Sequence, residues 1–282
     1  RAGFQAPDQP HRECLHALLF RPGYARIAKS DLLSTSWECV MFRVIISVAL
    51  AIFLSVANLP TKAPAQNYDD LFREFDARFL TSEDKRFLQL ALAFEGVYQG
   101  LLDGDWGRLS QRALDRYALR EFGTPSQDWH MAKLAFNFME RYTEDGWKIQ
   151  QLPGSDLSIL VPQKTLIVDP PSESFVNYRH RNSSLSVSYG ILTPSVTNRI
   201  HDFTFRQGGT AIKPYLVRKT ALAITSVSKA DGSTLYTRSN HANGRWSTVM
   251  VSASPRDRNI LNAVVASISV GPPPSLAPTE GG

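Results

Sequence analysis

Residues 88–117 read LQLALAFEGVYQGLLDGDWGRLSQRALDRY and decide the fold of the first part of this 282-residue chain. Apolar residues recur at helical spacing at both ends of this stretch, which predicts two helices joined by a loop. The loop carries glycines at positions 96, 100, 104 and 107. Because glycine adopts positive φ without steric cost, the pattern predicts tight turns around Tyr98, Asp103 and Trp106.

The helix boundaries follow from capping chemistry. Residues 81–84 (TSED) predict a helix start, since a hydroxyl can cap free backbone N–H groups and acidic residues favour the positive end of the helix dipole. In the second helix we expect an apolar, core-facing stripe that begins at Leu109. Gly123 and Gly146 are expected to end the second helix and a third one.

From Trp147 onward the sequence changes to β-rich runs between Pro, Gly, Asn and Asp clusters. The predicted strands are 157–161, 175–178, 185–189, 221–227, 235–238 and 246–253. Strict alternation in residues 185–189 (LSVSY) predicts one buried and one solvent-facing side. Pro255 is expected to open a final amphipathic helix, and the Pro/Gly-rich tail 271–282 is expected to be disordered.

These patterns together predict an α+β fold in two domains. A small helical bundle is expected over residues 66–145. Over residues 146–270 we expect an antiparallel sheet domain with a packed C-terminal helix.

An internal segment has the composition of a secretory signal peptide. Met41-Phe42-Arg43 precedes the apolar run 44–57, and Ala63-Pro64-Ala65 forms a cleavage site. The run is shorter than the roughly 20 apolar residues that a spanning helix needs. We expect a signal peptide over 41–65, cleavage after Ala65 and a periplasmic or secreted protein, with a signal anchor in the inner membrane as the alternative. Residues 1–40 are then upstream or mis-started sequence, or a disordered segment.

The positions of the cysteines and the balance of charges exclude several functions for the mature protein. Both cysteines, Cys14 and Cys39, precede Met41, so the mature chain has no disulfide, thiol nucleophile or lipid-anchored cysteine. After residue 65 there are 24 Lys and Arg residues against 22 Asp and Glu residues. We therefore expect no nucleic-acid partner and no stable membrane anchor after cleavage.

The glycine-punctuated stretch resembles the peptidoglycan-binding-like domain, a three-helix cell-wall module, over about residues 84–122. The matching positions are Leu88-Gln89, Leu92, Gly96, Tyr98, Gly100, Asp103-Gly104, Trp106-Gly107, Ala113-Leu114 and Tyr117. The chain departs from the pattern where Ser110 replaces the usual Thr and where Val97 displaces the aromatic Tyr98 by one position. The resemblance implies a helical fold and binding of peptidoglycan, at a stem peptide or glycan.

Four residues are the candidate ligand contacts: Tyr98, Asp103, Trp106 and Arg112. An aromatic floor with a few polar groups suits recognition of a wall peptide or glycan. The same residues also have structural interpretations. Asp103 can accept backbone N–H bonds that fix the turn at Gly104, and Trp106 can bury one face in the core.

The C-terminal region is distantly similar to PsbP/Mog1-type α+β domains. The similarity lies in the order of its features: a Tyr-x-Arg strand at residues 236–238, a strand led by Trp246, and a helix before a proline stop. It adds support for the α+β class of this region.

No catalytic motif stands out in the mature sequence. Its four histidines, at positions 130, 180, 201 and 241, form no zinc-ligand pair, and no G-x-S-x-G segment exists. We expect these histidines in turns or on the surface, with His201 and Asp202 able to orient one another, and residues 179–181 (RHR) in a solvated loop. No catalytic residue, metal or cofactor is expected.

The leading functional hypothesis is a non-catalytic envelope protein that docks on peptidoglycan and presents its C-terminal domain, with an envelope protein as a further partner. One alternative is a divergent cell-wall hydrolase or protease-like enzyme. Its site would gather His180, His201 or His241 with a carboxylate and a serine. The other alternative is a protein-interaction module without wall affinity.

Overall fold

The computed structural model describes residues 72–276 of the chain. This part is a mixed α+β structure with five α-helices and two antiparallel sheets, so the predicted α+β class is confirmed. Residues 1–40, the expected signal peptide at 41–65 and the last residues of the tail, 277–282, lie outside the described residues.

Three helices come first along the described chain: α4 (Ser82–Phe94), α5 (Arg108–Phe122) and α6 (Asp128–Asp145), after the short 3-10 turn η1 (Ala77–Phe79). The predicted start of α4 is confirmed, because Thr81 and Asp84 each accept a bond from the other's backbone N–H. Gly123 and Gly146 end α5 and α6 in the left-handed conformation, also as predicted.

The strands form a large and a small sheet. The large sheet has the order β3-β4-β5-β9-β8-β7-β6 and the small one the order β1-β2-β10. The strands are β1 (Trp147–Gln151), β2 (Leu157–Pro162), β3 (Leu166–Asp169), β4 (Val176–His180), β5 (Ser186–Leu192), β6 (Tyr215–Lys219), β7 (Leu222–Ser228), β8 (Thr234–Ala242), β9 (Arg245–Ala253) and β10 (Ser269–Val270). The predicted alternation in β5 is confirmed, because Leu185, Val187 and Tyr189 are buried between half-buried serines.

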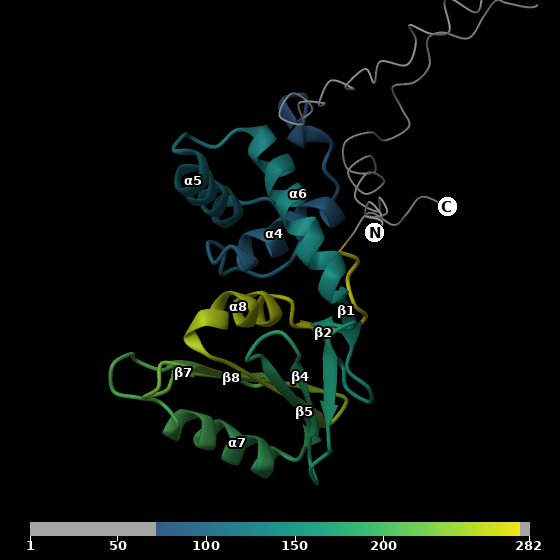
Figure 1. Cartoon of the computed structure of the whole chain (residues 1–282). Coiled ribbons are helices and arrows are strands. Elements are labelled where there is room, and N and C mark those ends of the chain that lie inside the picture. The colour runs from purple at the N-terminus through teal and green to yellow at the C-terminus, as the bar shows by residue number, and fades with distance from the viewer. Residues whose placement is uncertain (1–71, 277–282) are drawn as a thin grey trace, which may run out of the picture.

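Two helices cover opposite faces of the large sheet (Figure 1). Helix α7 (Pro194–Arg206), which the sequence analysis did not predict, packs on β7, β8 and β9 from one side. Helix α8 (Arg258–Ala266) follows a 3-10 turn that begins at Pro255 and packs on the other side, with α4 lying against its outer surface.

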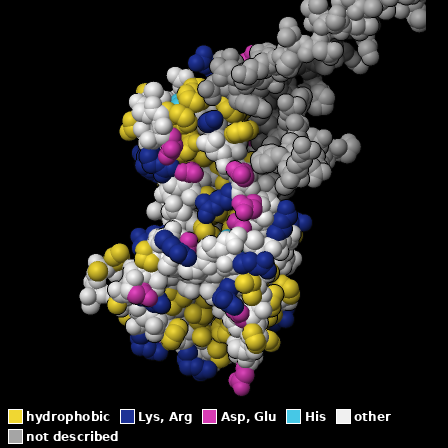
Figure 2. Space-filling model, viewed as in Figure 1, with side chains coloured by type: hydrophobic (Ala, Val, Ile, Leu, Met, Phe, Trp, Pro, Cys, Tyr) yellow, Lys and Arg dark blue, Asp and Glu magenta, His cyan; other side chains and the backbone are white. Residues whose placement is uncertain are grey.

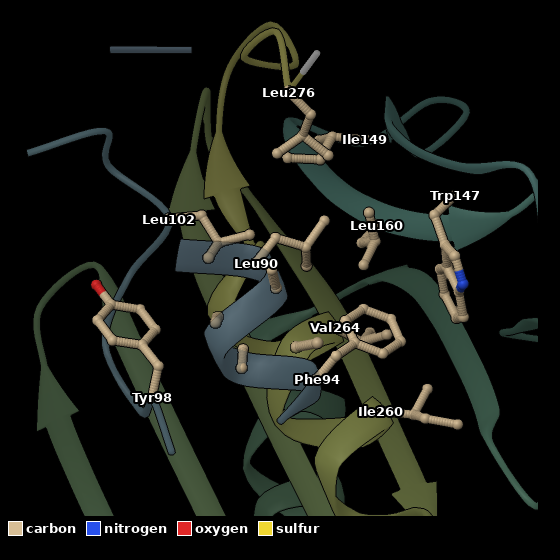
Figure 3. Packing of buried hydrophobic residues seen from close by; sticks show 14 of the residues in the cluster. Leu90, Phe94, Tyr98, Leu102, Trp147, Ile149, Leu160, Ile260, Val264 and Leu276 are labelled. Carbon is tan, nitrogen blue, oxygen red and sulfur yellow. The ribbon is translucent and has the colours of Figure 1, made fainter. Parts of the chain in front are cut away.

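One hydrophobic core joins the helices to the sheets. Phe94 of α4 lies against Phe138 of α6 and Trp147 of β1, with ring centroids 4.9 and 5.2 Å apart. Figure 3 shows Phe94 beside Val264 of α8 and Leu160 of β2, all within the same cluster. The expected boundary at residues 145–146 therefore falls inside a shared core.

Two sequence expectations are corrected here. Leu109 does not face the core, because it lies on the outer side of α5 and is 64% exposed. The first residues of the tail, 271–276, are not disordered: Gly271 pairs with Asp156, the Ser275 carbonyl accepts from Arg86, and Leu276 is buried. Burial of the Leu276 side chain supplies the free energy that holds this proline-rich segment in place.

Candidate functional site

Gln89, which is fully buried on α4, organises the glycine loop. Its amide nitrogen donates to Asp103 Oδ1 at 2.8 Å, to the Asp105 carbonyl at 2.9 Å and to Ser110 Oγ at 3.2 Å. Its amide oxygen accepts from the Gly104 N–H at 3.0 Å. One side chain thus ties α4 to the loop and to the first turn of α5, which makes the loop rigid. Sequence reasoning placed Gln89 in a family pattern but missed this function.

The predicted turn at Asp103 and Gly104 is confirmed. Asp103 Oδ1 accepts the Asp105 N–H at 3.0 Å, and Gly104 has a φ of +80°. A Cβ at Gly104 would lie 2.4 Å from the Ser82 carbonyl oxygen, so only glycine fits between this turn and the start of α4.

The two aromatic residues of the loop lie at different depths. Tyr98 is only 3% exposed, and its hydroxyl donates to the Leu101 carbonyl at 2.6 Å. Burial raises the pKa of this hydroxyl. Trp106 is half-buried against the core, and its indole N–H donates to Gln111 at 3.1 Å. Trp106 therefore reaches the surface, whereas Tyr98 supports the loop from inside.

The outer face of α5 carries an exposed stripe. Leu109, Arg112, Arg116 and Leu119 follow the spacing that places residues on one side of a helix, and all four are exposed. Arg116 donates to the Val97 carbonyl, which connects the stripe to the glycine loop. Arg112 takes part in none of the ion pairs found within residues 72–276. Two leucines thus flank two arginines on this surface; in Figure 2, Lys and Arg side chains gather at this edge of the molecule.

The prediction that the histidines lie in turns or on the surface is wrong for three of the four. His130, His180 and His201 are at most 4% exposed, whereas His241 is exposed. His130 Nδ1 accepts the Gln127 N–H at 2.8 Å and so caps α6. Each buried histidine is held by a specific partner, as buried polar groups require.

His201 lies between α7 and the large sheet. Its Nδ1 is 2.9 Å from Thr225 Oγ1 and its Nε2 is 3.0 Å from Ser239 Oγ. The expected pairing with Asp202 does not occur, because Asp202 is exposed while the ring points into the interface. Burial lowers the pKa of His201 to about 4, so the ring is neutral at pH 7.

His180 connects a carboxylate to a serine. Its Nε2 lies 3.1 Å from Asp145 Oδ1, and its Nδ1 lies 2.8 Å from Ser183 Oγ. Asp145 is the last residue of α6, His180 ends β4 and Ser183 lies in the following turn. Residues 179–181 are thus not a solvated loop, since Arg179 and His180 belong to β4 and His180 is buried.

We expected no catalytic residue because the sequence shows no catalytic motif. The fold nevertheless brings a serine, a histidine and a carboxylate within hydrogen-bond distance. Such a chain can increase the nucleophilicity of a hydroxyl. His201 and His241 contribute nothing to it, because one lies on the α7 side of the sheet and the other is exposed.

An open cleft of about 560 Å³ lies where α6, β1 and the tail meet. Trp147 and Ile149 of β1 line it, with Lys148 and Lys164 among its polar residues. Neither His180 nor Ser183 lines this cleft. The cleft and the hydrogen-bond chain of His180 are therefore separate features of the molecule.

Within residues 72–276, no group of three or more His, Asp or Glu side chains is placed to hold a metal ion. No helix in this part of the chain combines the length and hydropathy needed to cross a membrane. Searches against protein-family models and curated protein sequences find no match to the chain.

Proposed function

We propose that this chain is a cell-envelope protein that docks on peptidoglycan through the outer face of α5 and the adjoining glycine loop. The observation that carries this proposal is the exposed stripe of Leu109, Arg112, Arg116 and Leu119, which Arg116 connects to the glycine loop. Secretion by the expected signal peptide at residues 41–65 would deliver the stripe to the wall.

The chemistry of the stripe suits a wall stem peptide. Stem peptides carry free carboxylates on short aliphatic residues, and a guanidinium binds a carboxylate through two parallel N–H bonds. Arg112 is the residue best placed for this contact, because it has no ion-pair partner within residues 72–276. Leu109 would cover the aliphatic part of the peptide.

The remaining candidate contacts act indirectly in this proposal. Asp103 and Tyr98 shape the loop through their bonds to Asp105, Gln89 and Leu101, so the binding surface is preorganised before the ligand arrives. The sheet region shares a core with the helices, so docking would hold it in a fixed orientation at the wall.

Retention of the purified 282-residue chain on isolated sacculi tests this proposal. The variant L109S/R112A should bind at least about tenfold more weakly, as expected for the loss of about 1.4 kcal/mol. Raising the salt concentration should weaken binding of the wild type, since the proposed contact is ionic. A matched control, R199A/L216S, removes an exposed arginine and an exposed leucine from the opposite end of the protein and should bind like the wild type.

Two results would contradict the proposal. One is a wild type that is not retained on sacculi at low salt. The other is equal retention of the wild type and L109S/R112A when circular dichroism shows both to be folded.

A further inference from the structure

The hydrogen-bond chain from Asp145 through His180 to Ser183 lies on the sheet region, away from the proposed wall-binding stripe. We propose that Ser183 is a nucleophile that takes up acyl groups from activated esters, that His180 is its general base, and that Asp145 is the positioning residue for His180. This activity is independent of peptidoglycan docking.

Asp145 is bonded as a carboxylate and not as an acid. Four donors reach it: Trp147 Nε1, Thr165 Oγ1, Asn182 Nδ2 and His180 Nε2, at 3.1 to 3.3 Å. The carboxylate is nearly buried and sits at the C-terminal end of α6, where the helix dipole disfavours a negative charge. The four donors offset that cost and fix both oxygens in place.

The bonding of Asp145 determines the tautomer of His180. A carboxylate only accepts hydrogen bonds, so His180 must carry its proton on Nε2, which faces Asp145 Oδ1. In the neutral ring, Nδ1 is then an acceptor and Ser183 donates its hydroxyl proton to it at 2.8 Å. Trp147 packs edge-on against the imidazole, with centroids 5.3 Å apart, and restricts its rotation. The proton of Ser183 thus already points at a base that is held in one orientation.

Ser183 is more exposed than its base. It lies in the turn between β4 and β5 and is half-buried, whereas His180 is buried. The Leu185 N–H donates to Ser183 Oγ at 3.2 Å and fixes the position of this oxygen relative to His180. The exposed Arg181, two residues earlier, favours an ester whose acyl group carries a carboxylate.

The reaction balances with water as the second substrate. Ser183 Oγ forms a bond to the ester carbonyl carbon, and its proton passes to His180 Nδ1. The bond from that carbon to the alcohol oxygen breaks, and the alcohol leaves with the proton from His180. Water then attacks the acyl-serine and gives a proton to His180, which returns it to Ser183 Oγ as the acid leaves. No oxidant or reductant takes part.

Labelling with a fluorophosphonate probe tests the nucleophile directly. The 282-residue chain should take up one phosphonyl group on Ser183, located by mass spectrometry of the peptides, and should release p-nitrophenolate from p-nitrophenyl succinate. Ser183→Ala should abolish both signals. Ser184→Ala is the matched control, because Ser184 lies in the same turn but bonds to Asp257, and it should react like the wild type.

Two further variants separate catalysis from structural support. His180→Gln should slow labelling about 100-fold, the typical contribution of a general base. Asp145→Asn should lower the labelling rate and shift the midpoint of its pH profile to lower pH, a change that loss of packing alone would not produce. If Ser183→Ala does not fold, Ser183→Cys in the same turn should still be acylated by p-nitrophenyl succinate.

Three results would overturn the proposal. The first is a wild type that neither takes up the probe nor cleaves the ester. The second is labelling that persists in a folded Ser183→Ala chain, and the third is a folded Ser183→Cys chain that is not acylated. Any of these would leave the Asp145–His180–Ser183 chain as a structural support of the β4–β5 turn.

Discussion

The two faces of the large sheet are held by different chemistry. On the side of α8, buried aliphatic residues meet: Val249 and Val251 of the sheet are fully buried, as are Val264 and Ala263 of the helix. On the side of α7, the buried residues of the helix are Thr197, His201 and Thr204. These face hydroxyl groups of the sheet, at Thr225, Thr237, Ser239 and Thr248.

The polar interface is held together by hydrogen bonds and not by buried apolar area. Thr204 Oγ1 lies 2.7 Å from Thr237 Oγ1, and Ser239 Oγ bridges His201 and Thr248. The aromatic residues of α7, Phe203 and Phe205, are meanwhile 44% and 48% exposed, and Figure 2 shows hydrophobic side chains on the surface of this part of the molecule. The apolar interface gains stability from buried area, whereas the polar one requires that each group keep its partner.

The largest expected effect comes from the shared core outside α8, beyond the apolar interface. Phe94→Ala should lower the free energy of unfolding by about 3–5 kcal/mol, because it removes a fully packed ring from the shared core. Urea denaturation followed by circular dichroism measures this change. Phe203→Ala on the polar side is the matched control and should cost less than about 1 kcal/mol, since the ring is largely in water. Equal losses for the two phenylalanines would contradict the comparison.

An intermediate effect is expected from the polar side. His201→Leu keeps a similar volume but leaves Thr225 and Ser239 without a bond to the ring. We expect the free energy of unfolding to fall by about 2 kcal/mol, because two buried hydrogen bonds are lost. The same denaturation experiment gives this value. An unchanged or increased stability would show that the interface tolerates apolar residues.

The smallest effect at neutral pH is a dependence of stability on pH that arises on the polar side. Burial lowers the pKa of His201 in the folded chain to about 4. As the pH falls below about 6.5, the unfolded chain therefore binds a proton at this ring before the folded chain does. Stability should therefore be full above pH 6.5 and fall between pH 6.5 and 4, by up to about 1.4 kcal/mol per pH unit. Urea midpoints across this range should show a shallower decline for His201→Leu than for the wild type. Parallel profiles would contradict the role of His201.

The sequence predicted the features that depend on local chemistry. Alternation identified β5, and left-handed glycines identified the ends of α5 and α6, because both signals are written in neighbouring residues. Helix α7 escaped prediction for a physical reason. Its buried face is Thr197, His201 and Thr204, so the apolar period that marks a helix is missing.

The candidate sites were predictable to a different degree. The Asp103–Gly104 turn could be inferred because its bond spans two residues. The pairing of Asp145 with His180 could not, because 35 residues separate them and the contact exists only after β4 has paired within the sheet. The chain around His180 offers no local signal of a carboxylate partner.

The central strand pair, β5 with β9, sets the order in which this sheet can be assembled. Ser186 pairs with Ser252 and Leu192 with Trp246, so the pairing closes a loop that contains α7, β6, β7 and β8. Closing so long a loop costs chain entropy before the contacts between β5 and β9 can offset it. The edge of β5 that pairs with β9 therefore stays unpaired until the whole region can assemble, and we expect folding of the sheet to be slow.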